Sequence, residues 1–230
     1  GTVIDSLYAI KKAVYEDKIT TFGHLLKAMK EDFRDDEILR QYLLHKVPKF
    51  CKDKDATEFG KKVMDDLAEC LGGQANYRGG KFEPSLFAFY SYNWFKNVTI
   101  ATADGRKSES ALSRGVNPSE STENINIAAL LDAIKTMDYT KYPGGAVIYM
   151  DIPLMYKTPQ PSLFASVMRA FCENGGSIMD FNVISRNALL EAQKNPETHK
   201  NIVVRVCGYS AYFHTLTAEM QNEVIQRTQR

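Results

Sequence analysis

Strand and helix segments alternate in the second half of the chain, and this alternation constrains the fold most. Short apolar, β-branched runs predict buried strands at residues 146–152, 177–184 and 202–206. The amphipathic stretches between them predict helices at 162–173 and 186–194. Because helices that connect strands pack over the faces of a sheet, the sequence predicts a mixed α/β fold in which helices cover the strands.

The first part of the chain has helical periodicity instead. Apolar residues recur every three or four positions, and Thr20-Thr21 and Asp35-Asp36 stand where helix N-caps are expected. Gly72 and Gly73 can end the last of these helices. Helices are therefore predicted within residues 3–47 and at 58–71.

Seven aromatic residues crowd residues 82–95, which is a composition compatible with base stacking. A nucleic-acid site would also need a basic groove, yet Lys plus Arg is 29 against 28 for Asp plus Glu, and the net charge is +1. No nucleic-acid partner is expected. We interpret the stretch as an aromatic strand packed in a core or an interface.

Residues 102–123 have little apolar periodicity and contain Asp104-Gly105-Arg106, which predicts a long loop, either ordered or disordered. Neither GxGxxG nor a P-loop is present, so a phosphate-binding loop is disfavoured. We interpret the loop mainly as structural support. A less favoured alternative is that Asn117 or Ser119 approaches a substrate.

The four cysteines, Cys51, Cys70, Cys172 and Cys207, are far apart and have no CxxC spacing. Neither a zinc site nor a disulfide framework is therefore expected, and free thiols fit a reducing compartment. No apolar run reaches the length of a membrane-spanning helix. We expect a cytoplasmic protein with no membrane contact and no bound metal or organic cofactor.

The terminal stretch 202–213 combines a strand with an unusual turn. Residues 202–206 predict a strand buried on both faces and broken only by Arg205, and Gly208 ends it. A tight aromatic loop follows, and Thr217 begins an amphipathic helix. By itself, a glycine at a strand end indicates a turn.

Arg205-Val206-Cys207-Gly208-Tyr209 resembles the glycyl-radical loop of the glycyl radical enzymes, a family that includes pyruvate formate-lyase and radical diol, choline and hydroxyproline lyases and dehydratases. The Gly-Tyr-Ser sequence resembles the dehydratase branch of this family. Other matching motifs, in family order, are Asp5-Ser6-Leu7, Leu25-Leu26-Lys27-Ala28, Asp104-Gly105-Arg106, Phe181-Asn182-Val183, 189–196 and Ile225-Gln226-Arg227-Thr228. The resemblance covers essentially the whole chain.

The resemblance implies half of a ten-stranded α/β barrel with surrounding helices. It divides a single C-terminal region into a mainly helical part at 1–73, a helix and strand half-barrel at 74–200, and a radical loop with a terminal helix at 201–230. It also implies that Gly208 carries a backbone radical and that Arg205, Val206, Cys207 and Tyr209 support its loop. Such a radical needs a planar α-carbon conjugated with both flanking amides, and only glycine has no Cβ to crowd that plane.

The same resemblance implies partners. In the family, an S-adenosylmethionine activating enzyme removes a hydrogen from the glycine, and the radical later passes to a cysteine on an upstream loop. No such loop is present here. Cys207 cannot replace it, since adjacent α-carbons are only about 3.8 Å apart and successive strand side chains point to opposite faces. We expect a larger partner chain that carries this cysteine and the substrate pocket. We also expect a small-molecule substrate, and a higher oligomer is compatible with this arrangement.

Three functions are open from the sequence. The favoured one is the radical-storing subunit of a split glycyl radical enzyme that catalyses dehydration or C–X or C–C cleavage; a fragment of a longer enzyme would have the same chemistry. The second is a non-catalytic spare part that restores an oxygen-damaged enzyme. The third is an unrelated α/β interaction module. For the first, we expect Gly208 to be buried against solvent, and residues 202–213 to swing out for activation.

Overall fold

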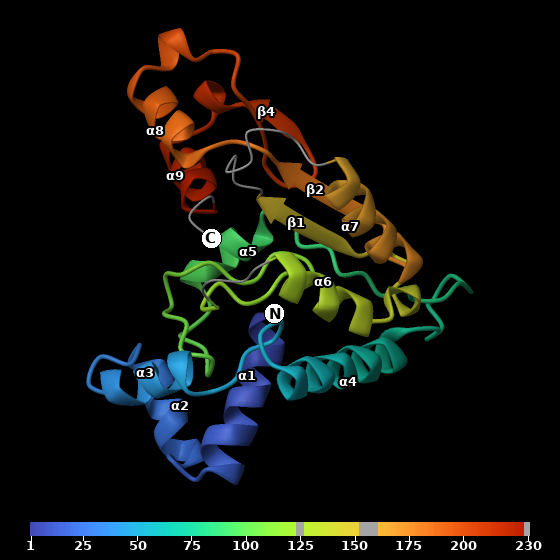
Figure 1. Cartoon of the computed structure of the whole chain (residues 1–230). Coiled ribbons are helices and arrows are strands. Elements are labelled where there is room, and N and C mark those ends of the chain that lie inside the picture. The colour runs from blue at the N-terminus through green and yellow to red at the C-terminus, as the bar shows by residue number, and fades with distance from the viewer. Residues whose placement is uncertain (123–126, 152–160, 228–230) are drawn as a thin grey trace.

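The computed structural model describes residues 1–122, 127–151 and 161–227, and helices surround its short strands (Figure 1). The helices are α1 (Thr2–Ile10), α2 (Phe22–Lys30), α3 (Glu37–His45), α4 (Lys54–Leu71), α5 (Ser91–Trp94), α6 (Ile127–Thr136), α7 (Pro161–Glu173), α8 (Arg186–Lys194) and α9 (Ala218–Arg227). The strands are β1 (Val147–Asp151), β2 (Ile178–Asn182), β3 (Val203–Arg205) and β4 (Ser210–Tyr212). This mixture of helices and strands agrees with the predicted α/β class.

Helices α1 to α3 form the N-terminal part of the molecule, at the bottom of Figure 1. α1 continues as a π-helical turn at Lys11–Glu16. α2 begins where predicted, because the Thr21 hydroxyl accepts a hydrogen bond of 3.2 Å from the backbone N–H of His24. Leu25 and Phe33 are buried in the apolar cluster between these helices. The helices predicted within residues 3–47 are confirmed.

α4 is a longer helix that packs against α1 and α6. It begins at Lys54, earlier than the predicted start at 58, because the Asp53 carboxylate accepts a hydrogen bond of 3.0 Å from the backbone N–H of Ala56. Gly72 and Gly73 follow its last turn, as predicted. No helix within the described ranges is long and apolar enough to cross a membrane.

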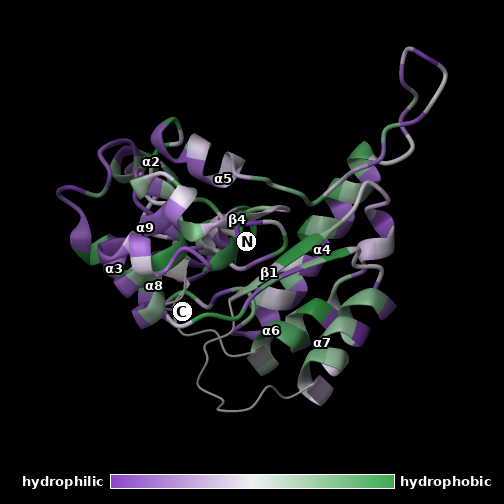
Figure 2. Ribbon diagram, turned by 90° about the horizontal axis from the view of Figure 1, so that it is seen from above, coloured by the Kyte–Doolittle hydropathy of each residue, from purple (hydrophilic) through white to green (hydrophobic). Residues whose placement is uncertain are grey.

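β1 and β2 form a parallel pair, with Val147 opposite Ile178 and Asp151 opposite Asn182. α6 and α7 pack against each other beside this pair (Figure 1). β1 is buried from Val147 to Met150, in agreement with the hydrophobic colour of its residues in Figure 2. The last position of the predicted strand 146–152, Ile152, lies outside the described residues.

Two asparagine side chains extend this pair in the manner of a strand. The Asn117 amide donates to the carbonyl of Tyr149 at 2.7 Å and accepts from its N–H at 2.9 Å. The Asn182 amide donates to the carbonyl of Arg205 at 3.0 Å and accepts from its N–H at 2.7 Å. The second amide therefore joins β2 to β3 by side-chain hydrogen bonds where backbone pairing is absent.

β3 and β4 form a short antiparallel hairpin, and the prediction of a strand buried on both faces is wrong here. Val203 is 53% exposed, whereas Val204 is buried. The two residues point to opposite faces, and one face of the hairpin packs on the cluster that contains Val224 and Ile225 of α9. The Thr217 hydroxyl accepts from the backbone N–H of Met220 at 3.3 Å, so the predicted start of the terminal helix is confirmed.

The predicted aromatic strand at 82–95 is also wrong over most of its length. Leu86 forms a single bridge to Ala146, after which the backbone hydrogen bonds are local and lead into α5. Tyr92 is buried, while Phe89 and Trp94 remain exposed. The β propensity of aromatic residues is thus outweighed by the turn that begins at Ala88, because β propensity depends on neighbours to pair with.

Candidate functional site

Gly208 lies in the turn of the β3–β4 hairpin. Arg205 pairs with Ser210, and the N–H of Val206 donates to the carbonyl of Tyr209 at 2.9 Å, which closes the turn. The φ angle of Gly208 is +81°, in the region that favours glycine. A Cβ at this position would approach Phe87 only to 3.5 Å, so the backbone conformation, rather than crowding, requires glycine.

A buried carboxylate from β2 holds this turn. Asp180 accepts a hydrogen bond of 2.9 Å from the backbone N–H of Gly208 with Oδ2, and one of 2.7 Å from the Arg205 guanidinium with Oδ1. Arg205 also donates to the Ser210 hydroxyl at 3.3 Å. The predicted supporting residue Arg205 and the glycine are therefore linked through the same carboxylate.

Asp180 is not among the site residues predicted from the sequence. Its position in the apolar strand 178–182 nevertheless indicates a special role, because a buried aspartate must find hydrogen-bond donors. The position of those donors could not be inferred, because Gly208 is 28 residues away along the chain.

The other residues predicted to support the loop occupy different surroundings. Val206 and Cys207 are buried, whereas Tyr209 is about half exposed. The Cys207 thiol donates to the Tyr92 hydroxyl at 3.5 Å, and that hydroxyl donates to Glu223 of α9 at 2.8 Å. The Cys207 side chain thus points into the core, as expected of a small buried residue.

Gly208 itself is exposed, contrary to the predicted burial. The hairpin has one packed face, and its turn projects beyond that face with the half-exposed side chains of Tyr209 and Tyr212 beside it. Within the described part of the chain, Phe87 is the only residue that would touch a Cβ at Gly208. A turn in this state is accessible to another protein but offers no protection from solvent.

The loop that contains Asp104 and Arg106 is ordered by these two buried charges. The Arg106 guanidinium donates to several backbone carbonyls, among them Ile100 at 2.7 Å and Lys107 at 2.8 Å. Asp104 accepts from the hydroxyls of three side chains of the same loop, Thr102, Ser119 and Ser121. The loop is therefore structural support, as the favoured interpretation held.

This environment also determines how Asp104 titrates. Burial by itself would raise the pKa of Asp104, but the charge of Lys49 and the hydroxyl donors Ser119 and Ser121 outweigh it and hold the pKa below its ordinary value. Ser119 is buried and its hydroxyl donates to Asp104, while the Asn117 amide donates to the Tyr149 carbonyl of β1. The alternative that either of them approaches a substrate finds no support in these contacts.

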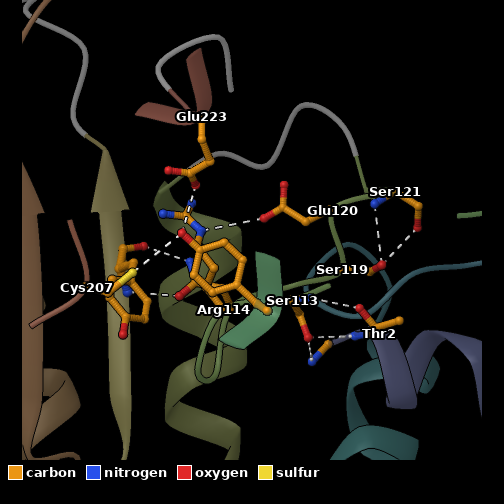
Figure 3. Close-up of polar contacts among 12 residues, drawn as sticks. Thr2, Ser113, Arg114, Ser119, Glu120, Ser121, Cys207 and Glu223 are labelled. Atoms are coloured by element: carbon orange, nitrogen blue, oxygen red, sulfur yellow. Dashed lines mark hydrogen bonds and ion pairs between the residues drawn. The ribbon is translucent and has the colours of Figure 1, made fainter. Parts of the chain in front are cut away.

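Arg114 is another buried cation, and the sequence did not indicate a role for it. Its guanidinium lies 5.6 Å from the centre of the Tyr149 ring, and its Nε lies 3.6 Å from Glu120. Figure 3 shows its side chain between the Glu120 and Glu223 side chains. Thr2 and Ser113 contact each other at the other end of the same view, where the Thr2 N–H donates to the Ser113 hydroxyl at 3.0 Å.

The described residues offer no set of three or more His, Cys, Asp or Glu side chains arranged to hold a metal ion. Cys51 and Cys207 are buried, and Cys70 and Cys172 are exposed on α4 and α7.

Two known protein families match this chain, one in its N-terminal part and the other in its C-terminal part. Residues 1–96 match the family described as pyruvate formate lyase-like, and residues 112–214 match the family described as glycine radical. The chain is 30% identical over its whole length to trans-4-hydroxy-L-proline dehydratase of Clostridioides difficile. It is 34% identical over 99% of its length to isethionate sulfite-lyase of Nitratidesulfovibrio vulgaris.

The fold is likewise similar to a solved structure, the glycerol-bound form of the B12-independent glycerol dehydratase from Clostridium butyricum. The TM-score is 0.87 with 31% sequence identity, over 97% of this chain. The chain spans 29%, 28% and 29% of the lengths of these three proteins, in the order named. The predicted fold, half of an α/β barrel with surrounding helices, is confirmed by this match.

Proposed function

Because this chain belongs to the glycyl radical enzymes, we propose that it is their radical-storing subunit, in which Gly208 carries the radical for a partner chain. The observation that carries the proposal is the turn itself. Gly208 lies within the segment that matches the glycine radical family, at a φ angle of +81° and at an exposed position. An activating enzyme that uses S-adenosylmethionine can therefore reach its α-carbon.

The chemistry at Gly208 is a transfer of hydrogen atoms. Loss of one hydrogen atom from the α-carbon leaves a radical that is shared with the two flanking amides. A hydrogen atom taken later from a cysteine thiol of the partner restores the C–H bond and leaves a thiyl radical, which takes a hydrogen atom from the substrate. Cys207 does not fill this role in the proposal, because its thiol is buried and directed at Tyr92.

Exposed apolar side chains on the hairpin support a partner chain. Val203, Tyr209 and Tyr212 are each about half exposed. Neighbouring exposed apolar side chains are typical of a face covered in an assembly. In the proposal, the partner covers this face, shields Gly208 from solvent and supplies the cysteine and the substrate pocket.

The reaction class follows from the relatives. Their names describe dehydration of hydroxyproline and release of sulfite from isethionate, and the matched structure is a glycerol dehydratase. These substrates are all small, but they are chemically different. We therefore propose a radical lyase or dehydratase that acts on a small molecule, without choosing among them.

Anaerobic electron paramagnetic resonance tests the proposal. The protein is incubated with the activating enzyme and S-adenosylmethionine, with and without the partner chain. We expect a doublet, split by the hydrogen that remains on the α-carbon, and its collapse when the protein is made with α-deuterated glycine. Gly208→Ala is the matched variant and should give no signal. The absence of a doublet from the wild-type protein in every combination would overturn the radical role.

Turnover distinguishes the two enzyme-linked functions. A split enzyme requires this chain for activity of an undamaged partner that has no radical glycine of its own. A spare part instead restores activity only to a full-length enzyme that oxygen has cleaved at its radical site. Activity in the first mixture supports our proposal, and activity confined to the second supports the alternative.

A further inference from the structure

An open groove lies between α1 and the segment that follows α5. Its cavity has a volume of about 490 Å³ and is lined in part by Val3 and Leu7 of α1 and by Phe95. These three side chains are 64%, 42% and 54% exposed, in the order named. Val3 and Leu7 are four residues apart, so they lie on the same face of the helix. We call this surface depression the α1–α5 groove.

The α1–α5 groove carries no charge. Each described residue that lines it is apolar or bears a hydroxyl group, although 25% of the residues of the chain are charged. Lys96 follows Phe95 directly but does not line the groove, and its ammonium group forms an ion pair of 3.2 Å with Glu219 of α9. A ligand that is recognised by its charge is therefore disfavoured, and the surface fits an uncharged occupant.

The hydroxyl groups of the groove are already used within the chain. Hydrogen bonds to other groups of this chain are made by the hydroxyls of Thr2, Ser6, Ser91, Tyr92, Thr102 and Ser113. A specific site for a small molecule has polar groups directed at the ligand, whereas these hydroxyls are directed at the protein. The groove therefore offers its occupant mainly apolar contact.

Tyr92 connects the groove with the hairpin. It lines the groove, and its hydroxyl accepts a hydrogen bond of 3.5 Å from the thiol of Cys207, the residue before Gly208. Tyr92 also belongs to the apolar cluster beneath the hairpin, and two other groove residues, Ala88 and Leu112, pack against that cluster. An occupant of the groove would thus lie against residues that support the hairpin from its packed face.

We propose that the α1–α5 groove is the docking site for an apolar, uncharged segment of the partner chain. This inference rests on the proposed function, which requires a partner. The chain spans 28–29% of the lengths of the three relatives named above, so more than two thirds of each of them lies outside the matched part. A partner that supplies the corresponding part has ample polypeptide to cover the groove, and an exposed apolar depression is typical of such an interface.

Two substitutions remove apolar contacts from the groove. Leu7→Ser and Phe95→Ala each shorten a side chain that is about half exposed, so the free chain should stay folded. Ile38→Ala is the matched control, because Ile38 is 90% exposed on α3 and does not line the groove. Circular dichroism of each variant verifies that the fold is retained.

The first measurement is the dissociation constant of this chain, without a radical, from the larger partner chain produced without this subunit. Truncation of a buried aromatic anchor at an interface weakens binding strongly, so we expect a roughly tenfold higher dissociation constant for Phe95→Ala. Leu7→Ser should act in the same direction, and Ile38→Ala should leave the dissociation constant unchanged. Equal affinities of the wild type and both groove variants, or equal weakening by Ile38→Ala, would overturn the inference.

This binding test is independent of the radical. Unchanged affinity in the groove variants together with a glycyl doublet would reject the groove and leave the proposed function standing. Weakened binding without a doublet in the wild type would reject the radical role and leave the docking site standing.

The second measurement identifies the occupant. Leu7→p-benzoylphenylalanine places a photo-crosslinking group in the groove, and the same substitution at Tyr209 is the comparison on the hairpin. We expect mass spectrometry to find an apolar peptide of the partner chain attached at position 7. Attachment to a second copy of this chain, or crosslinking of the partner from position 209 but not from position 7, would overturn the proposal.

Discussion

The two strand pairs of this molecule are built in opposite ways. β1 and β2 are parallel, and β1 is buried beside α6 and α7. β3 and β4 are antiparallel, three residues long, and joined by an exposed turn. The β3–β4 hairpin is therefore attached to the buried β1–β2 pair by side-chain hydrogen bonds from Asp180 and Asn182, and not by a continuous sheet.

The largest contrast is expected in hydrogen exchange. Without a partner chain, amides of residues 202–213 should exchange faster than those of β1 by orders of magnitude, because a short hairpin can open locally while β1 opens only with the core. Exchange measured by mass spectrometry after proteolysis resolves the two segments. Strong protection of 202–213 would contradict the proposed swinging of the hairpin.

Shortening a buried aromatic side chain in each region gives the next largest difference. Phe171 packs on Tyr139 in the central cluster with ring centres 5.3 Å apart, and Phe213 is equally buried beneath the hairpin. Phe171→Ala should lower the free energy of unfolding by about 3–5 kcal/mol. Phe213→Ala should act mainly on exchange of residues 202–213.

Denaturant unfolding measures the first change and hydrogen exchange the second. Phe95→Ala, at a position that is 54% exposed, is the control and should change the free energy of unfolding by less than about 0.5 kcal/mol. Equal global losses for Phe171→Ala and Phe213→Ala would show that the two regions unfold as one unit.

The two asparagine bridges provide a smaller, matched test. Asn182→Ala should destabilise the contact of β3 with β2 by about 1–3 kcal/mol, because it leaves the N–H and the carbonyl of Arg205 without these partners. Asn117→Ala removes the same pair of bonds from Tyr149. We expect faster hydrogen exchange along the hairpin in the first variant, and faster exchange only next to β1 in the second. The reverse pattern would contradict the attachment of the hairpin to β2 through Asn182.

The smallest effect on the free energy of unfolding is expected when the pH is lowered. The pKa of Asp104 lies below its ordinary value of 3.8, so its ionised form stabilises the fold at pH values above about 4. This contribution is lost as the pH falls through the lowered pKa, with a slope of at most about 1.4 kcal/mol per pH unit. Unfolding free energies measured between pH 5 and pH 2 should fall less steeply for Asp104→Asn, and equal slopes would contradict the assignment.

Local patterns allowed much of the fold to be predicted. The apolar periodicity located α1 to α4, and the hydroxyls of Thr21 and Thr217 begin α2 and α9 where expected. The prediction was wrong where a segment with high β propensity found no distant strand to pair with. The aromatic segment 82–95 has β propensity, but Leu86 alone forms a bridge.

The candidate site divides in the same way. The motif around Gly208 and the need for a residue without Cβ were visible in the sequence. The contact with Asp180 and the bridge from Asn182 were not, and Arg114 was not recognised, because each joins segments far apart in the chain.

The sequence by itself determined the helices of the first part of the chain, the starts of α2 and α9, the turn glycine and the resemblance to a family, because these depend on neighbouring residues. Only the tertiary structure decided that β2 holds the turn and that Gly208 is exposed in this chain. Those features depend on which distant donors and acceptors meet when the core closes. A buried carboxylate requires a partner, but packing selects which one.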